Sequence, residues 1–133
     1  MQVHEIMTTG AVSVRVRTTV GEAWEALQSL DVRHLPVIDE NRELVGIVSD
    51  RDFGAPPAPA LMTKLVGSSG PSPDAPVTSI MTAAPLSVEQ DAEVGEVIET
   101  MLENKIGAVP VVTPEGGVIV SYLDVLRAVQ ALV

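Results

Sequence analysis

The chain lacks cysteine, is poor in aromatic and basic residues, and carries only two histidines among 133 residues. Without cysteine there is no disulfide framework and no thiolate chemistry. The formal charge of −10 argues against a nucleic acid partner, because phosphate backbones are bound by Lys and Arg, and it disfavours anionic membrane surfaces. No apolar stretch is long enough to span a bilayer, and no signal peptide is visible. These absences predict a cytoplasmic protein that binds neither nucleic acid nor membrane.

Histidine and cysteine, which often act as nucleophiles, bases or metal ligands, are scarce or absent. His4 and His34 have no metal-ligand spacing with other residues, and no Ser-His-Asp or Cys-His arrangement is visible. We therefore expect no metal site, no cofactor and no enzymatic activity. The chain is instead 46% hydrophobic, which allows a core of Val, Ile, Leu, Ala and Met. Its length predicts one compact module, or two small halves that stabilise each other.

Much of the sequence occurs twice. At one fixed offset, the repeated words are Ile6-Met7-Thr8 and Ile80-Met81-Thr82, Ser13-Val14 and Ser87-Val88, Val20-Gly21-Glu22 and Val94-Gly95-Glu96, and Pro36-Val37 and Pro110-Val111. After a slip of two residues, Ile47-Val48-Ser49 corresponds to Ile119-Val120-Ser121, and Asp52 corresponds to Asp124. This duplication predicts two similar units related by an approximate twofold axis. A pocket between them would be lined by equivalent residues of both copies.

Both copies predict the same order of elements, a turn-like start, a strand, an amphipathic helix, two strands joined by a turn, and a last helix. The expected strands are near 12–14, 34–38, 44–48, 86–88, 108–112 and 118–120, and the amphipathic helices begin near Val20 and Val94. Thr19 and Glu22 have the spacing of a capping box. The last helix is expected from Ser121 through Val133, whereas Gly54 and the prolines after it cut its counterpart short.

The stretch between the copies is rich in Pro, Gly and Ser. This composition predicts an extended and mobile connector, within which 60–66 has the apolar residues for one or two helical turns. The chain then divides into a first repeat at 1–54, a linker at 55–76 and a second repeat at 77–133.

The ordered, duplicated motifs resemble those of the CBS-domain pair, also called a Bateman module, over nearly the whole chain outside the linker. The motifs are the Ile-Met-Thr openings, the Pro-Val strands (Val32 to Val37 and Ile106 to Val111), the Leu-Val-Gly-Ile-Val-Ser strand, and Ser-x-x-Asp (Ser49 to Asp52 and Ser121 to Asp124). The residues from Arg33 to Val37 and from Ser49 to Phe53 are similar to those of small stand-alone bacterial CBS proteins. The resemblance implies an α+β fold, in which two β-α-β-β-α repeats pack through their sheets with pseudo-twofold symmetry.

The Ser-x-x-Asp motifs have two interpretations. A serine at a helix N-cap and a carboxylate three residues later close a capping box, which explains the pattern by itself. The same helix start also presents free N–H groups to a phosphate, and the carboxylate can accept hydrogen bonds from ribose hydroxyls. The resemblance implies that Asp52 and Asp124 hold ribose and that Ser49 and Ser121 lie near phosphate.

The Pro36 and Pro110 strands suit a sheet edge, because proline removes a backbone donor. The resemblance implies that these strands contact a nucleotide base, with Val32, Leu35, Ile106 and Val109 as apolar walls. The first copy carries Arg33, His34 and Arg51, where the second carries Gly107, Ala108 and Leu123. The resemblance implies that basic residues of this strand reach phosphates, so we expect Arg33, His34 and Arg51 to form a phosphate cluster. The alternative is that Arg33 and Arg51 pair with Asp31 or Asp50 at the surface.

The sequence thus predicts a regulatory module that binds an adenosine-containing small molecule, namely AMP, ADP or ATP, or else S-adenosylmethionine or NAD(H). The expected nucleotide-binding residues are Arg33, His34, Leu35, Pro36, Ser49, Asp50, Arg51, Asp52, Thr82, Ala83, Pro85, Ile106, Gly107, Ala108, Val109, Pro110, Ser121, Tyr122 and Asp124. The last helix is apolar on more than one face, which favours a homodimer, and an unknown effector protein would read the ligand state. The alternative is a protein-interaction module that binds no ligand.

Overall fold

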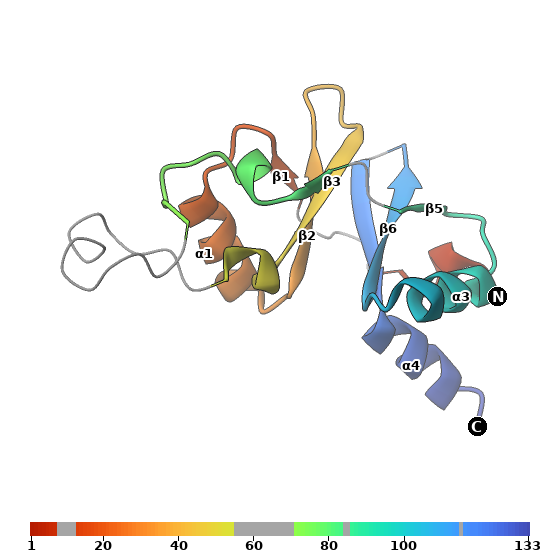
Figure 1. The fold of residues 1–133 in the computed structure, drawn as a ribbon. Helices are drawn as coiled ribbons and strands as arrows, with labels where there is room; N and C mark the ends of the chain where they lie inside the picture. Colours follow the sequence, from red (N-terminus) through yellow and green to blue (C-terminus); the bar gives the residue numbers. More distant parts are fainter. Residues whose placement is uncertain (8–12, 55–70, 84–85, 115) are drawn as a thin grey trace.

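Two β-sheets face each other at the centre of the molecule, and helices cover their outer faces (Figure 1). The structure is a computed structural model that describes residues 1–7, 13–54, 71–83, 86–114 and 116–133. Strand β2 of one sheet packs against strand β7 of the other. The fold is therefore α+β with two sheets packed together, as the sequence predicts.

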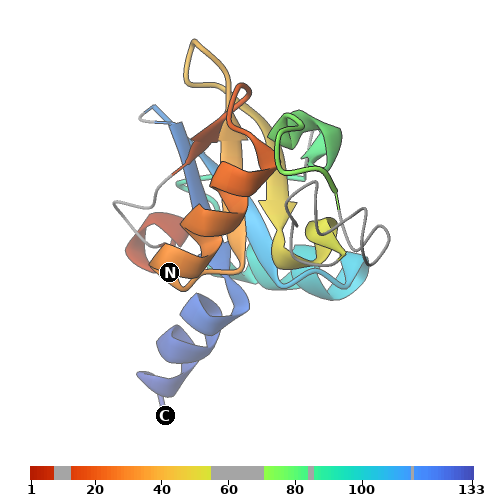
Figure 2. The same ribbon diagram turned by 90° about the vertical axis from the view of Figure 1, so that its left-hand side faces the viewer.

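The first half contains a four-stranded sheet in the order β1-β2-β3-β4. Its elements are β1 (Val14–Arg15), α1 (Val20–Leu30), β2 (His34–Ile38), β3 (Leu44–Ser49) and the 3-10 helix η2 (Asp50–Phe53). Strand β4 (Thr82–Ala83) comes from the second repeat and pairs antiparallel with β3. Figure 2 shows α1 lying across the outer face of this sheet.

The second half contains a three-stranded sheet in the order β5-β6-β7. Its elements are β5 (Val88–Glu89), α3 (Val94–Asn104), β6 (Ala108–Thr113), β7 (Gly116–Ser121) and α4 (Tyr122–Gln130). The register repeats that of the first half, since Pro36 lies opposite Ile47 and Pro110 lies opposite Ile119. Equivalent residues therefore hold equivalent places, as the duplication predicts.

The start of each repeat docks on the other half. The start of the first repeat, η1 (Val3–Glu5), places the buried Val3 in the second core, and the start of the second repeat, η3 (Val77–Ser79), places the buried Val77 in the first core. Val3 N–H donates to Ala92 O at 2.9 Å, and Val77 N–H donates to Thr18 O at 2.7 Å. This exchange interlocks the halves, so that a repeat in sequence is not a unit in space.

The end of the expected linker is also held in place. Residues 71–76 run along the start of α1, where Val20 N–H donates to Ala75 O at 2.8 Å and Gly21 N–H donates to Pro73 O at 2.9 Å. These bonds satisfy donors that a helix N-terminus leaves without an intrahelical partner. Residues 55–70, which include the predicted helical turns at 60–66, lie outside the described residues.

The prolines of β2 and β6 correct one expectation. Both strands are central, because β2 lies between β1 and β3 and β6 lies between β5 and β7. The expected sheet edge exists only locally, since β1 pairs with Val37 and Ile38 and does not reach Pro36. In the same way, β5 pairs only with Val111 and Val112, beyond Pro110. The N–H that each proline lacks is therefore not needed for pairing with β1 or β5.

Helix ends follow local chemistry. Thr19 and Glu22 form the predicted capping box at α1, with Thr19 Oγ1 accepting from Glu22 N at 3.1 Å. Helices α1 and α3 end at equivalent residues in the left-handed conformation, Asp31 (φ 53°) and Lys105 (φ 55°). Helix α4 begins after Ser121 as expected but ends at Gln130 rather than Val133, because the residues beyond it are exposed and make no packing that would hold another turn.

The two cores are mostly aliphatic, as expected from the composition, but the first also buries the aromatic Phe53, which the expectation did not include. The first is built around Leu27, Leu35, Val48 and Phe53, and the second around Val97, Val109 and Val120. Trp24 contacts Phe53 edge to face with ring centroids 5.0 Å apart. No helix among the described residues is long and apolar enough to cross a membrane.

Candidate ligand-binding site

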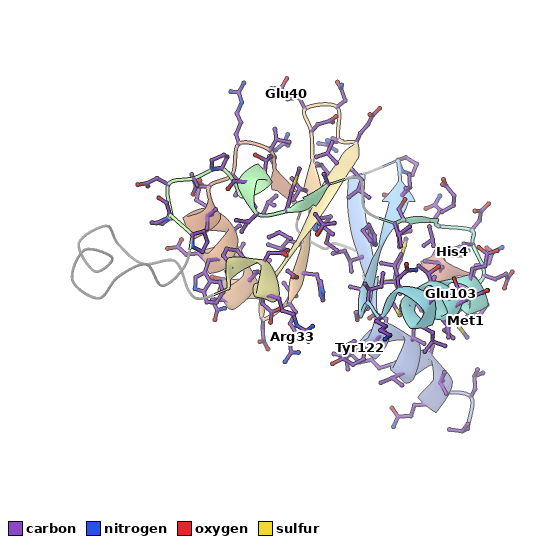
Figure 3. All side chains as sticks on the ribbon, in the orientation of Figure 1. Met1, His4, Arg33, Glu40, Glu103 and Tyr122 are labelled. Carbon is purple, nitrogen blue, oxygen red and sulfur yellow. The ribbon has the colours of Figure 1, made fainter. Side chains whose placement is uncertain are left out.

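A cavity of about 420 Å³ opens between the two halves. Its lining from the first repeat consists of Arg33, His34, Ile47, Ser49, Asp50, Arg51 and Asp52. Its lining from the second repeat consists of Thr82, Leu86, Lys105, Ile106, Gly107, Ala108, Pro110 and Tyr122. Figure 3 shows Arg33 and Tyr122 at the same end of the seam, one on each half. The volume is in the range of small-molecule sites.

Ser49 and Asp52 lie at the turn from β3 into η2. Ser49 N–H donates to Asp52 Oδ2 at 2.7 Å, so that the carboxylate is held by its own turn. Asp52 is half-buried and lines the cavity. Helix η2 ends at Phe53, and Gly54 caps it with a φ of 65°. The shortened helix that the sequence predicts therefore leaves this motif beside the cavity.

The equivalent motif of the second repeat has different surroundings. Asp124 is 9% exposed, and its Oδ2 accepts from Ser121 N at 2.8 Å and from Ser121 Oγ at 3.1 Å. Its Oδ1 lies 3.7 Å from Arg127 Nη1, one turn along α4. Neither Ser121 nor Asp124 lines the cavity. The equivalent of Thr82 is Thr8, which lies outside the described residues, and nucleotide contact at Asp124 stays a prediction.

Three cationic side chains line the cavity. Arg33 and Arg51 come from the first half and Lys105 comes from the second, and all three are exposed. Within the described part of the chain, none of them forms an ion pair with a carboxylate. The expected alternative, in which Arg33 and Arg51 pair with Asp31 or Asp50, is therefore not seen there. Asp50 and Asp52 supply the acidic groups of the lining.

His34 begins β2 opposite Ser49 and is half-buried in the cavity wall. Burial lowers the pKa of His34 from its ordinary value of 6.5, an effect that Asp50 and Asp52 oppose and Arg33 and Arg51 reinforce. The imidazole is therefore neutral at pH 7. A neutral ring can both donate and accept a hydrogen bond, whereas protonation would add a fourth cation to the lining.

Tyr122 connects the cavity to α4. It is the first residue of that helix, and its N–H donates to Gly107 O at 2.8 Å. Its ring lies on Gly107, since a Cβ at residue 107 would lie 3.2 Å from Tyr122 Cδ1. The glycine thus leaves room for an aromatic ring that is 45% exposed and borders the cavity.

The structure brings twelve of the predicted site residues to the cavity. It does not bring Leu35, Pro36, Ala83, Val109, Ser121 or Asp124 there, and Pro85 lies outside the described residues. The side chains of Leu35 and Val109 lie in the two hydrophobic cores instead, because alternate strand residues point to opposite faces. They are not the apolar walls that the sequence suggests.

Three lining residues are absent from the sequence prediction, namely Ile47, Leu86 and Lys105. Ile47 lies two positions before Ser49 on the same face of β3, so the strand period alone identifies it. Lys105 reaches the cavity because α3 ends there, which no sequence motif signals. No group of three or more metal-ligating residues is arranged to hold an ion within the described residues.

The model of the CBS domain matches the chain twice, at residues 3–53 and 77–131. The chain therefore belongs to the CBS-domain family, as a pair of CBS domains, and the resemblance drawn from its motifs is confirmed. Among curated relatives, an uncharacterized 17.7 kDa protein of Acidianus ambivalens is 30% identical over 129 residues, which are 96% of this chain and 72% of the relative.

Solved CBS-domain structures have the same fold. CBSX2 in complex with AMP is 28% identical with a TM-score of 0.79, covering 98% of this chain and 97% of that one. The CBS domain pair of protein MJ0100 in complex with 5-methylthioadenosine and S-adenosyl-L-methionine is 24% identical with a TM-score of 0.77, covering 100% and 98%. At that identity the second likeness concerns the fold alone.

Proposed function

We propose that the protein is a regulatory module that binds an adenosine-containing ligand in the cavity between its halves. The observation that carries this proposal is that one cavity of about 420 Å³ is lined jointly by both repeats and combines Asp52 with unpaired cations. A similar CBS-domain structure is a complex with AMP. The candidate ligands are AMP, ADP, ATP, S-adenosylmethionine and NAD(H).

Each group in the cavity suits a part of such a ligand. The Asp52 carboxylate can accept hydrogen bonds from both ribose hydroxyls, and Ser49 and Thr82 add hydroxyl donors and acceptors. Arg33 and Arg51 can each bind a phosphate in a bidentate manner. Ile47, Ile106 and Pro110 form apolar walls for the base.

Regulation would follow from differential binding. A ligand that contacts both repeats stabilises one relative arrangement of them, and it shifts the population by its difference in affinity for the two arrangements. Tyr122 borders the cavity and begins α4, so that ligand contact there acts directly on that helix. In this proposal the module itself performs no catalysis, and another protein reads the arrangement.

Helix α4 offers the surface through which the chain would pair with a second copy. Both views show it running away from the body (Figure 1, Figure 2). Leu123, Leu126 and Val129 are 46%, 57% and 46% exposed along it, and Leu102 of the neighbouring α3 is 74% exposed. These residues, called the α4 surface below, form the interface of the proposed homodimer, because an exposed apolar surface gains stability when a partner covers it.

Thermal unfolding with a panel of AMP, ATP, S-adenosylmethionine and NADH tests the proposal. A ligand at about one hundred times its dissociation constant stabilises the fold by about 2.7 kcal/mol. Asp52→Ala should abolish that shift, while Asp91→Ala, which removes an exposed carboxylate away from the cavity, should preserve it. If no compound shifts the transition, the ligand-free interaction module becomes the better proposal.

A further inference from the structure

The cations of the cavity are unusual in a chain with a net charge of −10. The whole sequence contains eight Lys and Arg residues, and three of them, Arg33, Arg51 and Lys105, line this one cavity. Elsewhere in the described chain, Arg17 and Arg127 are paired with carboxylates, whereas Arg15 and Arg42 form no ion pair, so it is the clustering of the three cavity cations that sets them apart. Asp50 and Asp52 line the same cavity and offset part of this charge, but both belong to the first half, so the side of the cavity around Lys105 carries a cation with no carboxylate beside it in the lining. Such an arrangement favours a ligand with negative charge that reaches the second half.

The placement of the three cations further restricts the ligand. Arg33 and Arg51 stand on the first half, at the start of β2 and in η2, whereas Lys105 stands on the second half at the end of α3. A single phosphate group is a compact tetrahedron of oxygens, which suits the two arginines alone. A chain of two or three phosphates is longer, and because the cations stand on both halves it is the group that would contact them together.

The two repeats differ at the same positions. The residue equivalent to Lys105 is Asp31, and the residue equivalent to Arg51 is Leu123. Asp31 and Lys105 share the left-handed backbone conformation at a helix end, so this conformation belongs to the fold and only the side chain differs. The repeats have therefore diverged so that two cations line the described cavity. The equivalent positions of the other repeat, Asp31 and Leu123, hold an acid and an apolar residue.

We infer that the ligand of this cavity is a nucleoside diphosphate or triphosphate, and that Lys105 is the residue that selects it over a monophosphate. This inference rests on the proposed function and names the ligand class within it. Lys105 binds the terminal phosphate from the second half, while Arg33 and Arg51 bind the phosphate nearest the ribose. The polyphosphate then ties the two halves together at the described cavity.

Calorimetric titration with adenosine, AMP, ADP, ATP and S-adenosylmethionine, in buffer with EDTA, tests the inference. The affinity should rise from AMP to ATP by about tenfold, the size of one added charge-assisted contact. Lys105→Gln should lower the affinity for ATP by about tenfold and leave that for AMP nearly unchanged. Added salt should weaken ATP binding more than AMP binding.

Arg42→Gln is the matched control. Arg42 also has a left-handed backbone (φ 64°), is exposed, and lies in the β2–β3 turn away from the cavity, next to Glu40, which Figure 3 shows at the far end from Arg33. This variant should bind ATP as the parent protein does. A second variant, Arg51→Gln, should weaken AMP and ATP equally.

Two groups of results separate this inference from the proposed function. If AMP or S-adenosylmethionine binds as tightly as ATP, or if Lys105→Gln leaves the ratio of ATP to AMP affinity unchanged, the inference is overturned and the proposed function stands. If none of the five compounds binds, the proposed function itself fails. If Arg42→Gln reproduces the effect of Lys105→Gln, the preference is a general charge effect and the inference is also overturned.

Discussion

Substituting Gly46→Ala probes how tightly the second repeat is built into the first half. Gly46 is buried in the middle of β3, opposite Val37 of β2 and Ala83 of β4. A Cβ at this position would collide with Met81 Sδ and lie 3.0 Å from Thr82 O. The Met81 thioether can move aside, but Thr82 O belongs to the backbone of β4. The side chain therefore has to push β4 away from β3.

Overpacking of this kind costs about 1–3 kcal/mol of the free energy of unfolding. We expect the Gly46→Ala variant to show that loss in urea denaturation, with the slope of the transition unchanged. Because Thr82 lines the cavity, the same displacement should also weaken nucleotide binding. The variant thus links the interlocking of the halves to the site.

Gly95→Ala is the control for this substitution. Gly95 lies in the first turn of α3, and nothing lies within 4 Å of a Cβ built there. The alanine should be neutral or stabilise the fold by up to about 1 kcal/mol, since glycine is a poor helix former. A Gly46→Ala protein as stable as its parent would refute the close contact between β3 and β4.

Four other predictions concern the side chains of Asp124, His34 and Leu126. Asp124→Ala should lower the stability by about 1–2 kcal/mol in urea denaturation, because it removes the carboxylate of the α4 capping box, which accepts from Ser121 N and Ser121 Oγ. It should leave ATP binding at the described cavity intact, and lost binding would move the site to Asp124. Burial lowers the pKa of His34 in the folded protein, so the unfolded chain takes up a proton first as the pH falls below about 6.5. The free energy of unfolding should therefore decrease from that pH downward. A His34→Gln variant with the same decrease would contradict this cause. Bound ATP should favour the imidazolium, so that ATP binds more tightly as the pH falls, measurable by calorimetry. Leu126→Glu should convert dimers into monomers in light scattering, and an unchanged mass would remove the α4 surface from the interface.

Local patterns in the sequence predict much of the fold. The duplication gives both repeats, and β2 (His34–Ile38) has the bounds that its flanking residues suggest. Thr19 and Glu22 identify the start of α1 because capping is a contact within one turn. Gly54 and the prolines after it correctly predict the shortened helix η2.

Contacts between distant segments could not be predicted in this way. The order of elements does not say on which half a start segment docks, so the exchange of Val3 and Val77 appears only in the structure. Lys105 lines the cavity because helix α3 ends beside it. No motif in the neighbouring sequence signals this position. Leu35 and Val109 lie on the predicted strands, but their side chains face the cores. The prediction included them because it counted every residue of each strand rather than the residues of one face.

Hydrogen–deuterium exchange of the intact protein, with and without saturating ATP, tests the central claim most directly. The cavity is lined by both repeats, so we predict slower exchange at residues 47–53 and at 104–108 together, with no change in the turn at 39–43. Protection confined to one repeat, or to neither while ATP is bound, would contradict a ligand site shared between the halves.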